Sequence, residues 1–190
     1  EALERSRNLQ AILPSFANDP IAESRSFSLP EAGAAGTVTF YPAREGGAQG
    51  PVVAIAGEAV SGKGFGGDLR ILAGLRPDGT LLAVCVTSHA ETPGLGTKVT
   101  DRSRVRYIWQ AFAAETETGM PPSEFLDQFS GRSLAGLPAA GFSLVPKGTD
   151  PGVGGVHAVT GATVSSRAVL DAVNHIVAAF AAHREEIVGR

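Results

Sequence analysis

Cysteine is nearly absent from this sequence: Cys85 is the only one among 190 residues. A single cysteine excludes an internal disulfide and cannot by itself form a cysteine-based metal site. Cys85 lies within an apolar run, which favours a buried, unreactive thiol over a reactive one.

Long hydrophobic runs and a large charge of one sign are also missing. No stretch approaches the roughly 18 apolar residues that span a bilayer, and no secretory signal is visible. The formal net charge is only −3, so there is no basic surface for nucleic acid. We expect these residues to form a soluble unit that does not bind nucleic acid.

Several catalytic signatures are absent as well. No Gly-x-Ser-x-Gly motif occurs, which argues against a serine hydrolase of that type. Neither glycine-rich stretch meets the conditions for a dinucleotide-binding or phosphate-binding loop that leads into a helix. The four histidines are scattered, so a catalytic metal site has little support.

The composition indicates a folded chain with many turns. Hydrophobic residues make up 43% of the sequence, and 24 glycines accompany nine phenylalanines, two tyrosines and one tryptophan. A chain of this length can bury one continuous core. We predict a single α+β domain with an antiparallel sheet and packed helices.

Hydrophobic periodicity predicts a short N-terminal helix and a long C-terminal helix. Apolar residues at helical spacing indicate an amphipathic helix over residues 1–13, which Pro14 would stop. Val169, Val173, Ile176, Val177 and Phe180 give the C-terminal segment the longest apolar stripe, on a helix that begins near Thr163. Ser123 should cap a short helix over residues 124–129, and residues 130–151 are expected to be mostly loop.

The strands lie between these helices. Strand character is found near Phe27 and over residues 37–41 and 52–60. Residues 69–75 and 80–87 flank an Arg-Pro-Asp-Gly turn, so they should form an antiparallel hairpin.

Three polar segments leave alternatives open. Residues 61–67, with four glycines, are either a flexible bend or a backbone surface that approaches a flat ligand, with Phe65 as a stacking group. In the dense turn of residues 89–96, we expect His89 and Glu91 to form a structural hydrogen bond and not a metal site. The alternating arginines and neighbouring aromatics are either a solvated face or a docking surface for an acidic partner; they are Arg102, Arg104, Arg106, Tyr107 and Trp109.

The stretch from His157 to Ser166 is rich in small and hydroxyl residues and runs into the C-terminal helix. The first turn of a helix has unpaired N–H groups and the positive end of the helix dipole, which favour a phosphate. Gly161 and Ala162 would let that anion approach the backbone. The hydroxyls on offer belong to Thr160, Thr163, Ser165 and Ser166. The alternative is that Thr160 or Thr163 caps the helix and Gly161 forms the preceding turn.

Two separate motifs occur in a specific order. The first is Glu91-Thr92-Pro93-Gly94-Leu95-Gly96, and the second is Thr160-Gly161-Ala162-Thr163 followed by Val164-Ser165-Ser166-Arg167-Ala168-Val169. Together they resemble the FMN-binding domain of the G subunit of the Rnf electron-transport complex. The resemblance extends from about Gly57 to the last helix and includes residues 127–133. The C subunit of the sodium-translocating NADH:quinone reductase is a close relative, but residues 64–70 are more similar to the Rnf protein.

The resemblance implies that FMN is attached covalently through a phosphoester to the hydroxyl of Thr163. A separate flavin transferase would make this bond from FAD. The other cofactor-binding residues implied by the two motifs are Thr160, Gly161, Ala162, Val164, Ser165, Glu91, Thr92, Gly94 and Leu95. The family commonly has an aspartate three residues before the first threonine of the attachment motif, where this sequence has His157.

The resemblance also implies a domain division and a cellular setting. Residues 57–190 would be the FMN-binding domain, and residues 1–56 an N-terminal helix with irregular and strand segments that packs with it as one unit. An N-terminal transmembrane anchor outside this sequence would hold the chain on the periplasmic side of a bacterial inner membrane, beside other membrane subunits. The chain would relay electrons one at a time and not turn over a substrate alone. A non-redox module that binds a ligand or partner on the same fold is the alternative from another class.

Overall fold

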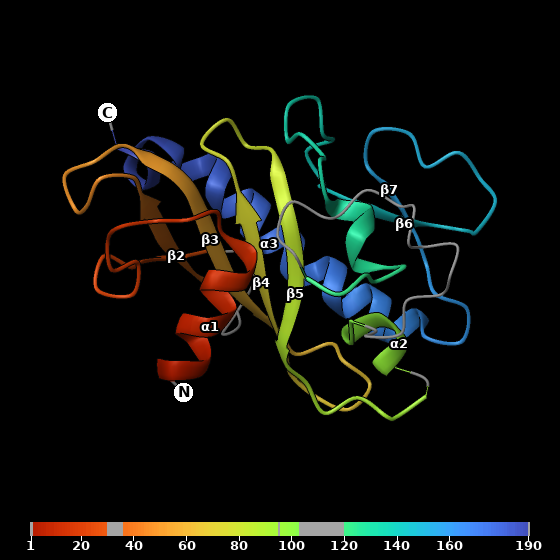
Figure 1. Cartoon of the computed structure of the whole chain (residues 1–190). Coiled ribbons are helices and arrows are strands. Elements are labelled where there is room, and N and C mark those ends of the chain that lie inside the picture. The colour runs from red at the N-terminus through yellow and green to blue at the C-terminus, as the bar shows by residue number, and fades with distance from the viewer. Residues whose placement is uncertain (1, 30–35, 95, 103–119, 190) are drawn as a thin grey trace.

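A five-stranded sheet forms the centre of the molecule (Figure 1). The computed structural model describes residues 2–29, 36–94, 96–102 and 120–189. The strands are neighbours in chain order and every pair is antiparallel. They are β1 (Arg25–Ser28), β2 (Thr37–Arg44), β3 (Val52–Ser61), β4 (Leu69–Leu75) and β5 (Leu81–Ser88). The predicted α+β class, antiparallel sheet and hairpin are confirmed.

Helices cover the two faces of the sheet (Figure 1). The C-terminal helix α3 (Thr163–Val188), which kinks at His183, packs behind β2, β3 and β4. The N-terminal helix α1 (Ala2–Ile12) crosses the opposite face near β4 and β5 and ends just before Pro14, as predicted. A short helix, α2 (Thr97–Thr100), lies near the start of α3 (Figure 1). A 3-10 turn, η3 (Leu126–Phe129), packs against β5.

Side chains of β3 alternate between the two faces, because successive residues of a strand point in opposite directions. Ile55 and Ala59 belong to the core under α3, whereas Ala54 and Ala56 belong to the smaller core under α1. Gly57 lets α3 approach closely, since a Cβ there would lie 2.5 Å from the Ile176 Cγ2 atom.

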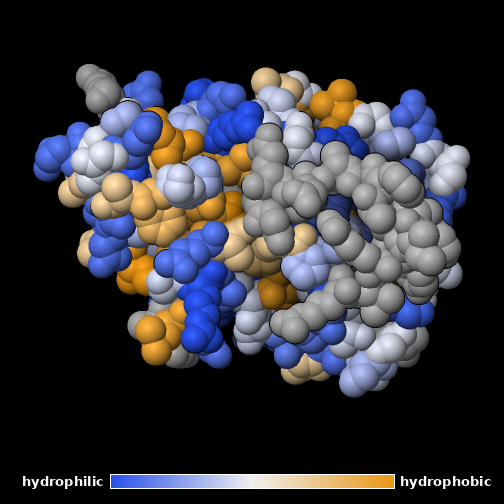
Figure 2. Space-filling view, in the orientation of Figure 1, coloured by the Kyte–Doolittle hydropathy of each residue, from blue (hydrophilic) through white to orange (hydrophobic). Residues whose placement is uncertain are grey.

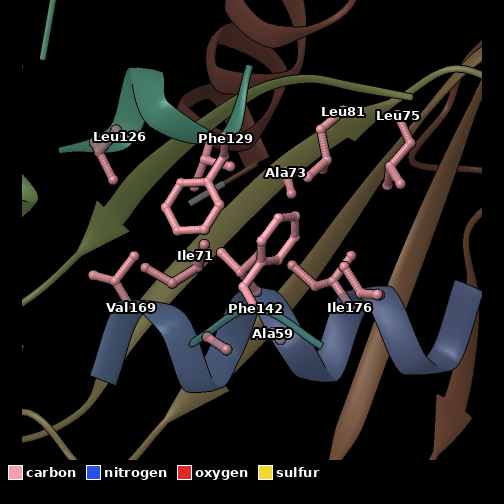
Figure 3. Close-up of a cluster of buried hydrophobic side chains, with 14 of the residues drawn as sticks. Ala59, Ile71, Ala73, Leu75, Leu81, Leu126, Phe129, Phe142, Val169 and Ile176 are labelled. Carbon is pink, nitrogen blue, oxygen red and sulfur yellow. The ribbon is translucent and has the colours of Figure 1, made fainter. Parts of the chain in front are cut away.

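The core under α3 joins helix, sheet and the segments around η3 (Figure 3). Val169 and Ile176 point from α3 toward the strands, Val169 lies next to Ile71 of β4, and the ring of Phe129 reaches into the same cluster. The rings of Phe129 and Phe142 meet edge to face with centroids 5.3 Å apart. Residues that precede the C-terminal helix are therefore fixed to the same core as the helix itself.

The face that carries α1 also holds a buried carboxylate. Apolar side chains remain visible over the strands beside the hydrophilic side of α1 (Figure 2). The Tyr41 hydroxyl donates a hydrogen bond to Glu58 at 2.9 Å, and the Arg70 guanidinium donates to the same carboxylate at 2.6 Å. Burial, with the charge of Glu58, raises the pKa of Tyr41 to about 12.

The expectation that residues 130–151 are mostly loop is confirmed. They include one short strand, β6 (Ser143–Val145), which pairs in parallel with β7 (Gly155–His157). Strands of three residues are too short to show a hydrophobic period. The helix expected over residues 124–129 is shorter, although the Ser123 hydroxyl does accept a hydrogen bond from the Leu126 N–H at 3.2 Å.

Two further expectations concern the arginine-rich segment and the membrane. Arg102 is not on a solvated face, because it pairs with Asp127 at 2.7 Å and is largely buried. Arg104, Arg106, Tyr107 and Trp109 lie outside the described residues. Within the described ranges, no helix is long and apolar enough to cross a membrane.

Candidate functional site

A cavity of about 330 Å³ lies at the N-terminal end of α3. Three segments that are far apart in the sequence line it: the glycine-rich loop after β3, the loop after β5, and the start of α3. The lining residues are Phe65, Glu91, Thr92, Gly96, Gly161, Ala162, Thr163, Val164 and Ser165. A volume of this size falls at the lower end of the range for small-molecule sites.

The start of α3 has no side-chain cap. Ala162 occupies the N-cap position, so the expectation that Thr160 or Thr163 caps the helix is wrong. Gly161 does form the preceding turn, with a φ of +81° that favours glycine. The N–H groups of the first turn therefore have no partner inside the helix and can bind an anion.

Ser166 fixes the turn before the helix, so the expectation that its hydroxyl is on offer to an anion is wrong. Its hydroxyl donates to the Ala162 carbonyl at 2.9 Å and accepts from the Val159 N–H at 3.3 Å. Ser166 is fully buried, so it is unavailable to a ligand. Its hydroxyl shapes the backbone on which Thr163 is presented.

Glu91 connects the loop after β5 to the helix. The Ser165 hydroxyl donates to its carboxylate at 2.6 Å, and the Gly66 N–H lies 3.4 Å from the other carboxylate oxygen. Both Glu91 and Ser165 are buried. A carboxylate is favourable near a helix N-terminus, and here it forms one wall of the cavity.

The glycines of the two loops are needed because backbone and Glu91 lie so close. A Cβ on Gly96 would lie 2.2 Å from the Glu91 Oε2 atom, and one on Gly64 would lie 2.8 Å from Oε1. A Cβ on Gly66 would lie 1.8 Å from the Ala90 carbonyl oxygen. Residues 61–67 are thus more than a flexible bend, because their backbone packs against the Glu91 loop.

Two apolar side chains project at the rim of the cavity. Phe65 is 73% exposed and Val164 is 46% exposed, and both line the cavity. Large apolar side chains on a surface are informative when they gather around a concave site. They give a flat ligand an apolar surface next to Thr163.

The His89 side chain links the loop that carries Glu91 to Asp101. The Glu91 N–H donates to His89 Nδ1 at 3.2 Å, and His89 Nε2 lies 2.9 Å from the Asp101 carboxylate. The expected structural hydrogen bond is confirmed. Among the described residues, no three or more histidine, cysteine or acidic side chains are grouped to hold a metal ion.

The predicted site residues divide into three groups. Glu91, Thr92 and the segment from Gly161 to Ser165 line one cavity. Thr160 and Gly94 are exposed and are not among the lining residues, so their contact with a cofactor stays a prediction. Leu95 lies outside the described residues. His157 also lies away from the lining, and its Nε2–H donates to the Thr149 carbonyl at 2.9 Å.

Comparison with known proteins assigns this geometry to a family. Residues 64–178 match the family described as FMN-binding domain. The chain belongs to this family. The match includes both motifs and the three segments that line the cavity, so the resemblance inferred from the sequence is confirmed.

Relatives of this FMN-binding domain are named as the G subunit of an ion-translocating oxidoreductase complex. One from Cereibacter sphaeroides is 34% identical over 90% of this chain and 64% of its own length. Another strain's protein is 33% identical over 95% of this chain and 69% of its own length. One from Vibrio vulnificus is 29% identical over 100% of this chain and 78% of its own length. The chain thus spans about two thirds of the first two relatives.

The residues present suit an FMN group. The uncapped first turn of α3 offers N–H groups for a phosphate, Thr163 offers an exposed hydroxyl at that turn, and Phe65 offers an aromatic face.

Proposed function

We propose that this chain is the FMN-carrying electron-transfer subunit of an ion-translocating oxidoreductase complex, in the role of its G subunit. The observation that carries the proposal is the cavity that joins the Glu91 loop to the Thr163 segment in a member of the FMN-binding family. The names of its relatives support the assignment to such a complex.

Thr163 is the proposed attachment residue. In flavin transfer from FAD, its hydroxyl loses a proton as Oγ1 bonds to the phosphorus of the FMN half. The anhydride bond of FAD breaks and AMP leaves. The phosphodiester keeps one negative charge, which the N–H groups at the start of α3 would stabilise. Covalent attachment would retain the cofactor without relying on its affinity.

When bound, FMN supplies the redox chemistry, while the protein orients it and tunes its surroundings. Phe65 is placed to stack on a ring system beside Thr163, and Val164 adds apolar surface on the same rim. The buried Glu91 carboxylate places a negative charge beside the site. Such a charge disfavours adding electrons to a nearby group, so Glu91 would lower the reduction potential of the flavin.

The setting is part of the same proposal. An N-terminal transmembrane segment outside these 190 residues would anchor the chain on the periplasmic side of the inner membrane. Its partners would be the other membrane subunits and, during maturation, a flavin transferase. The relatives are named as subunits of an ion-translocating complex, and moving ions across a membrane requires a complex in that membrane, which supports this setting.

The test is covalent flavin on the polypeptide. The chain is co-expressed with a flavin transferase, denatured, and examined for flavin fluorescence and for the mass of the peptide that contains Thr163. Wild type and Thr163→Ser should carry flavin, and Thr163→Ala should carry none. Ser143→Ala is the matched control, because it removes an exposed hydroxyl that does not line the cavity and should leave the attachment intact.

Two results would contradict the proposal. Covalent flavin that persists in Thr163→Ala would place the bond elsewhere. A wild-type protein without flavin would favour the non-redox alternative.

A further inference from the structure

We infer that Gln128 and Arg132 are positioning residues for flavin attachment. They hold β7 so that the attachment loop, residues 158–162, presents Thr163 in a fixed place. This inference rests on the proposed attachment at Thr163. Neither residue lines the cavity, so their contribution acts through the main chain.

Among the described strands, none pairs with the second edge of β7. On the edge toward β6, the Ser143 N–H donates to the Gly154 carbonyl at 2.9 Å and the Ala158 N–H donates to the Val145 carbonyl at 3.2 Å. Main-chain groups alternate along a strand, so those of Gly155 and His157 point to the other edge. Within the described part of the chain, β6 is the only strand paired with β7.

Gln128 provides the hydrogen bonds that a strand would have made to His157. Its side-chain Oε1 accepts from the His157 N–H at 2.7 Å, and its Nε2 donates to the His157 carbonyl at 3.1 Å. The second hydrogen of Nε2 points to the Glu124 carbonyl at 3.2 Å. Both hydrogens of Nε2 and the Oε1 atom therefore bind main-chain groups, which requires a side chain that carries a donor and an acceptor together.

Arg132, four residues after Gln128, binds main-chain carbonyls at the same edge of β7. Its guanidinium donates to the carbonyls of Gly155 at 3.1 Å and of Gly152 and Val153 at 3.0 Å each. Its Nε also donates to the Gln128 carbonyl at 3.2 Å, which links the two residues. We call this pair the Gln128–Arg132 clamp.

The clamp connects the attachment loop to the hydrophobic core. It belongs to η3 and the turn that follows, where Leu126 and Phe129 are fully buried. The far end of the loop is fixed by Ser166 and by Val169, which is buried in the same core. The loop is therefore held at both ends, and Thr163, the first residue of α3, follows it directly.

A fixed loop matters because phosphoryl transfer depends on the placement of the attacking oxygen. Displacement of a reacting group by about 1 Å can cost roughly 100-fold in rate. Loss of the clamp should leave the Thr163 hydroxyl chemically intact while it samples a wider range of positions.

The experiment compares two isosteric substitutions. Gln128→Met removes both bonds to His157 and keeps the side-chain volume. Asn174→Leu is the matched control, because the Asn174 amide makes the same pair of bonds to the Phe142 main chain, at 2.8 and 2.9 Å, away from the attachment loop. Hydrogen exchange is measured on the protein before flavin is added, and the initial rate of covalent attachment is measured with purified flavin transferase and FAD.

Gln128→Met should speed amide exchange over residues 155–162 and slow attachment at least about tenfold relative to Asn174→Leu. Gln128→Glu keeps the acceptor for the His157 N–H but turns its other carboxylate oxygen toward the carbonyls of His157 and Glu124, so it should slow attachment as well. Arg132→Lys, which cannot reach three carbonyls with one planar fork, should resemble Gln128→Met.

The inference is overturned if exchange over residues 155–162 is unchanged in Gln128→Met, or if attachment slows equally in Asn174→Leu. Faster local exchange with an unchanged attachment rate would also overturn it. Failure of the proposed function is distinguishable, since wild type would then take no covalent flavin while the exchange data still report on the clamp.

Discussion

The Ser165 hydroxyl lies 2.6 Å from the Glu91 carboxylate, although 74 positions separate the two residues. This hydrogen bond joins the two motifs that identify the family. Because both side chains are buried, the loop after β5 and the start of α3 are held as one wall of the cavity.

The bond between Ser165 and Glu91 should contribute measurably to stability. Ser165→Ala leaves a buried carboxylate with one donor fewer, and we expect it to lower the free energy of unfolding by about 2 kcal/mol. Glu91→Gln should cost less in Ser165→Ala than in wild type, by on the order of 1 kcal/mol. Urea denaturation of the four proteins measures the coupling, and strictly additive effects would show that the two side chains do not act together.

Gly96 should be intolerant of any side chain. A Cβ there would lie 2.2 Å from Glu91 Oε2 and 2.9 Å from Ser165 Oγ, so Gly96→Ala must push the two walls apart. We expect a loss of about 1–3 kcal/mol in the free energy of unfolding, together with less covalent flavin. Gly62→Ala is the control, since its nearest contact would be 3.5 Å. Equal behaviour of the two variants would contradict the close packing described here.

Cys85 should react slowly with alkylating reagents. Burial raises the pKa of its thiol to about 11, so little thiolate is present near neutral pH. At about pH 8 the folded protein should react with iodoacetamide on the order of 100-fold more slowly than free cysteine. The urea-unfolded protein should react at nearly the free rate. Rapid labelling of the folded state would show that the thiol is accessible and ionised.

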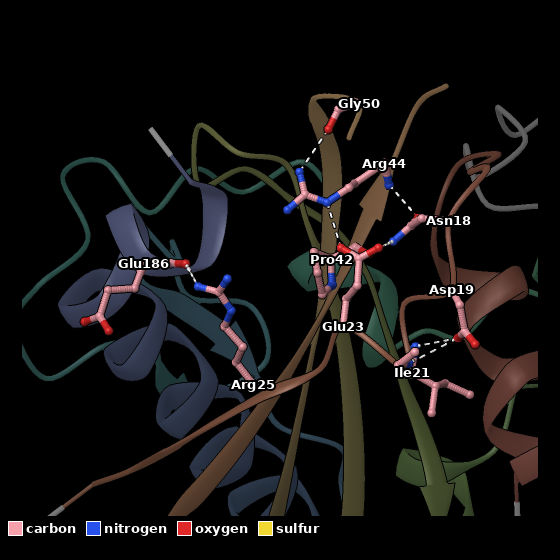
Figure 4. Close-up of polar contacts among 10 residues, drawn as sticks. Asn18, Asp19, Ile21, Glu23, Arg25, Pro42, Arg44, Gly50 and Glu186 are labelled. Atoms are coloured by element: carbon pink, nitrogen blue, oxygen red, sulfur yellow. Dashed lines mark hydrogen bonds and ion pairs between the residues drawn. The ribbon is translucent and has the colours of Figure 1, made fainter. Parts of the chain in front are cut away.

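Glu23 should make stability depend on pH. The Arg44 guanidinium, with a smaller contribution from Asn18, holds the pKa of Glu23 below its usual range (Figure 4). The folded state thus favours the charged carboxylate, so this stabilisation is present above the ordinary pKa of about 4.3 and disappears as the pH falls through the lowered value.

Glu23→Gln should therefore be less stable than wild type by about 1 kcal/mol at neutral pH, and the difference should vanish in strong acid. Glu45→Gln controls for removal of one exposed carboxylate from the adjoining loop. Denaturation at neutral pH and in strong acid measures both variants, and a difference that persists in strong acid would rule out the ion pair as its cause.

Local patterns determined much of this fold. The turn over residues 76–79 predicted the hairpin of β4 and β5, and Pro14 predicted the end of α1, because each is a constraint on a few consecutive backbone angles. The apolar stripe from Val169 to Phe180 predicted the long helix, since these apolar residues recur with the period of about 3.6 that is typical of a helix.

Long-range partners escaped the same reasoning. β6 and β7 are too short to show a period, and nothing near Gln128 in the sequence indicates that its amide binds the main chain of His157. The glycines at 64 and 66 looked like flexible chain, but glycine is needed at both positions because the distant loop that carries Glu91 packs so closely against them.

The amino-acid sequence by itself determined the two motifs, their order, and the hydroxyl at the start of a helix. Only the tertiary structure decided that both motifs line one cavity, that Glu91 binds Ser165, and that no side chain caps the helix. The reason is physical: backbone propensity and periodicity act over a few residues, whereas contacts between distant segments depend on how the sheet and α3 pack.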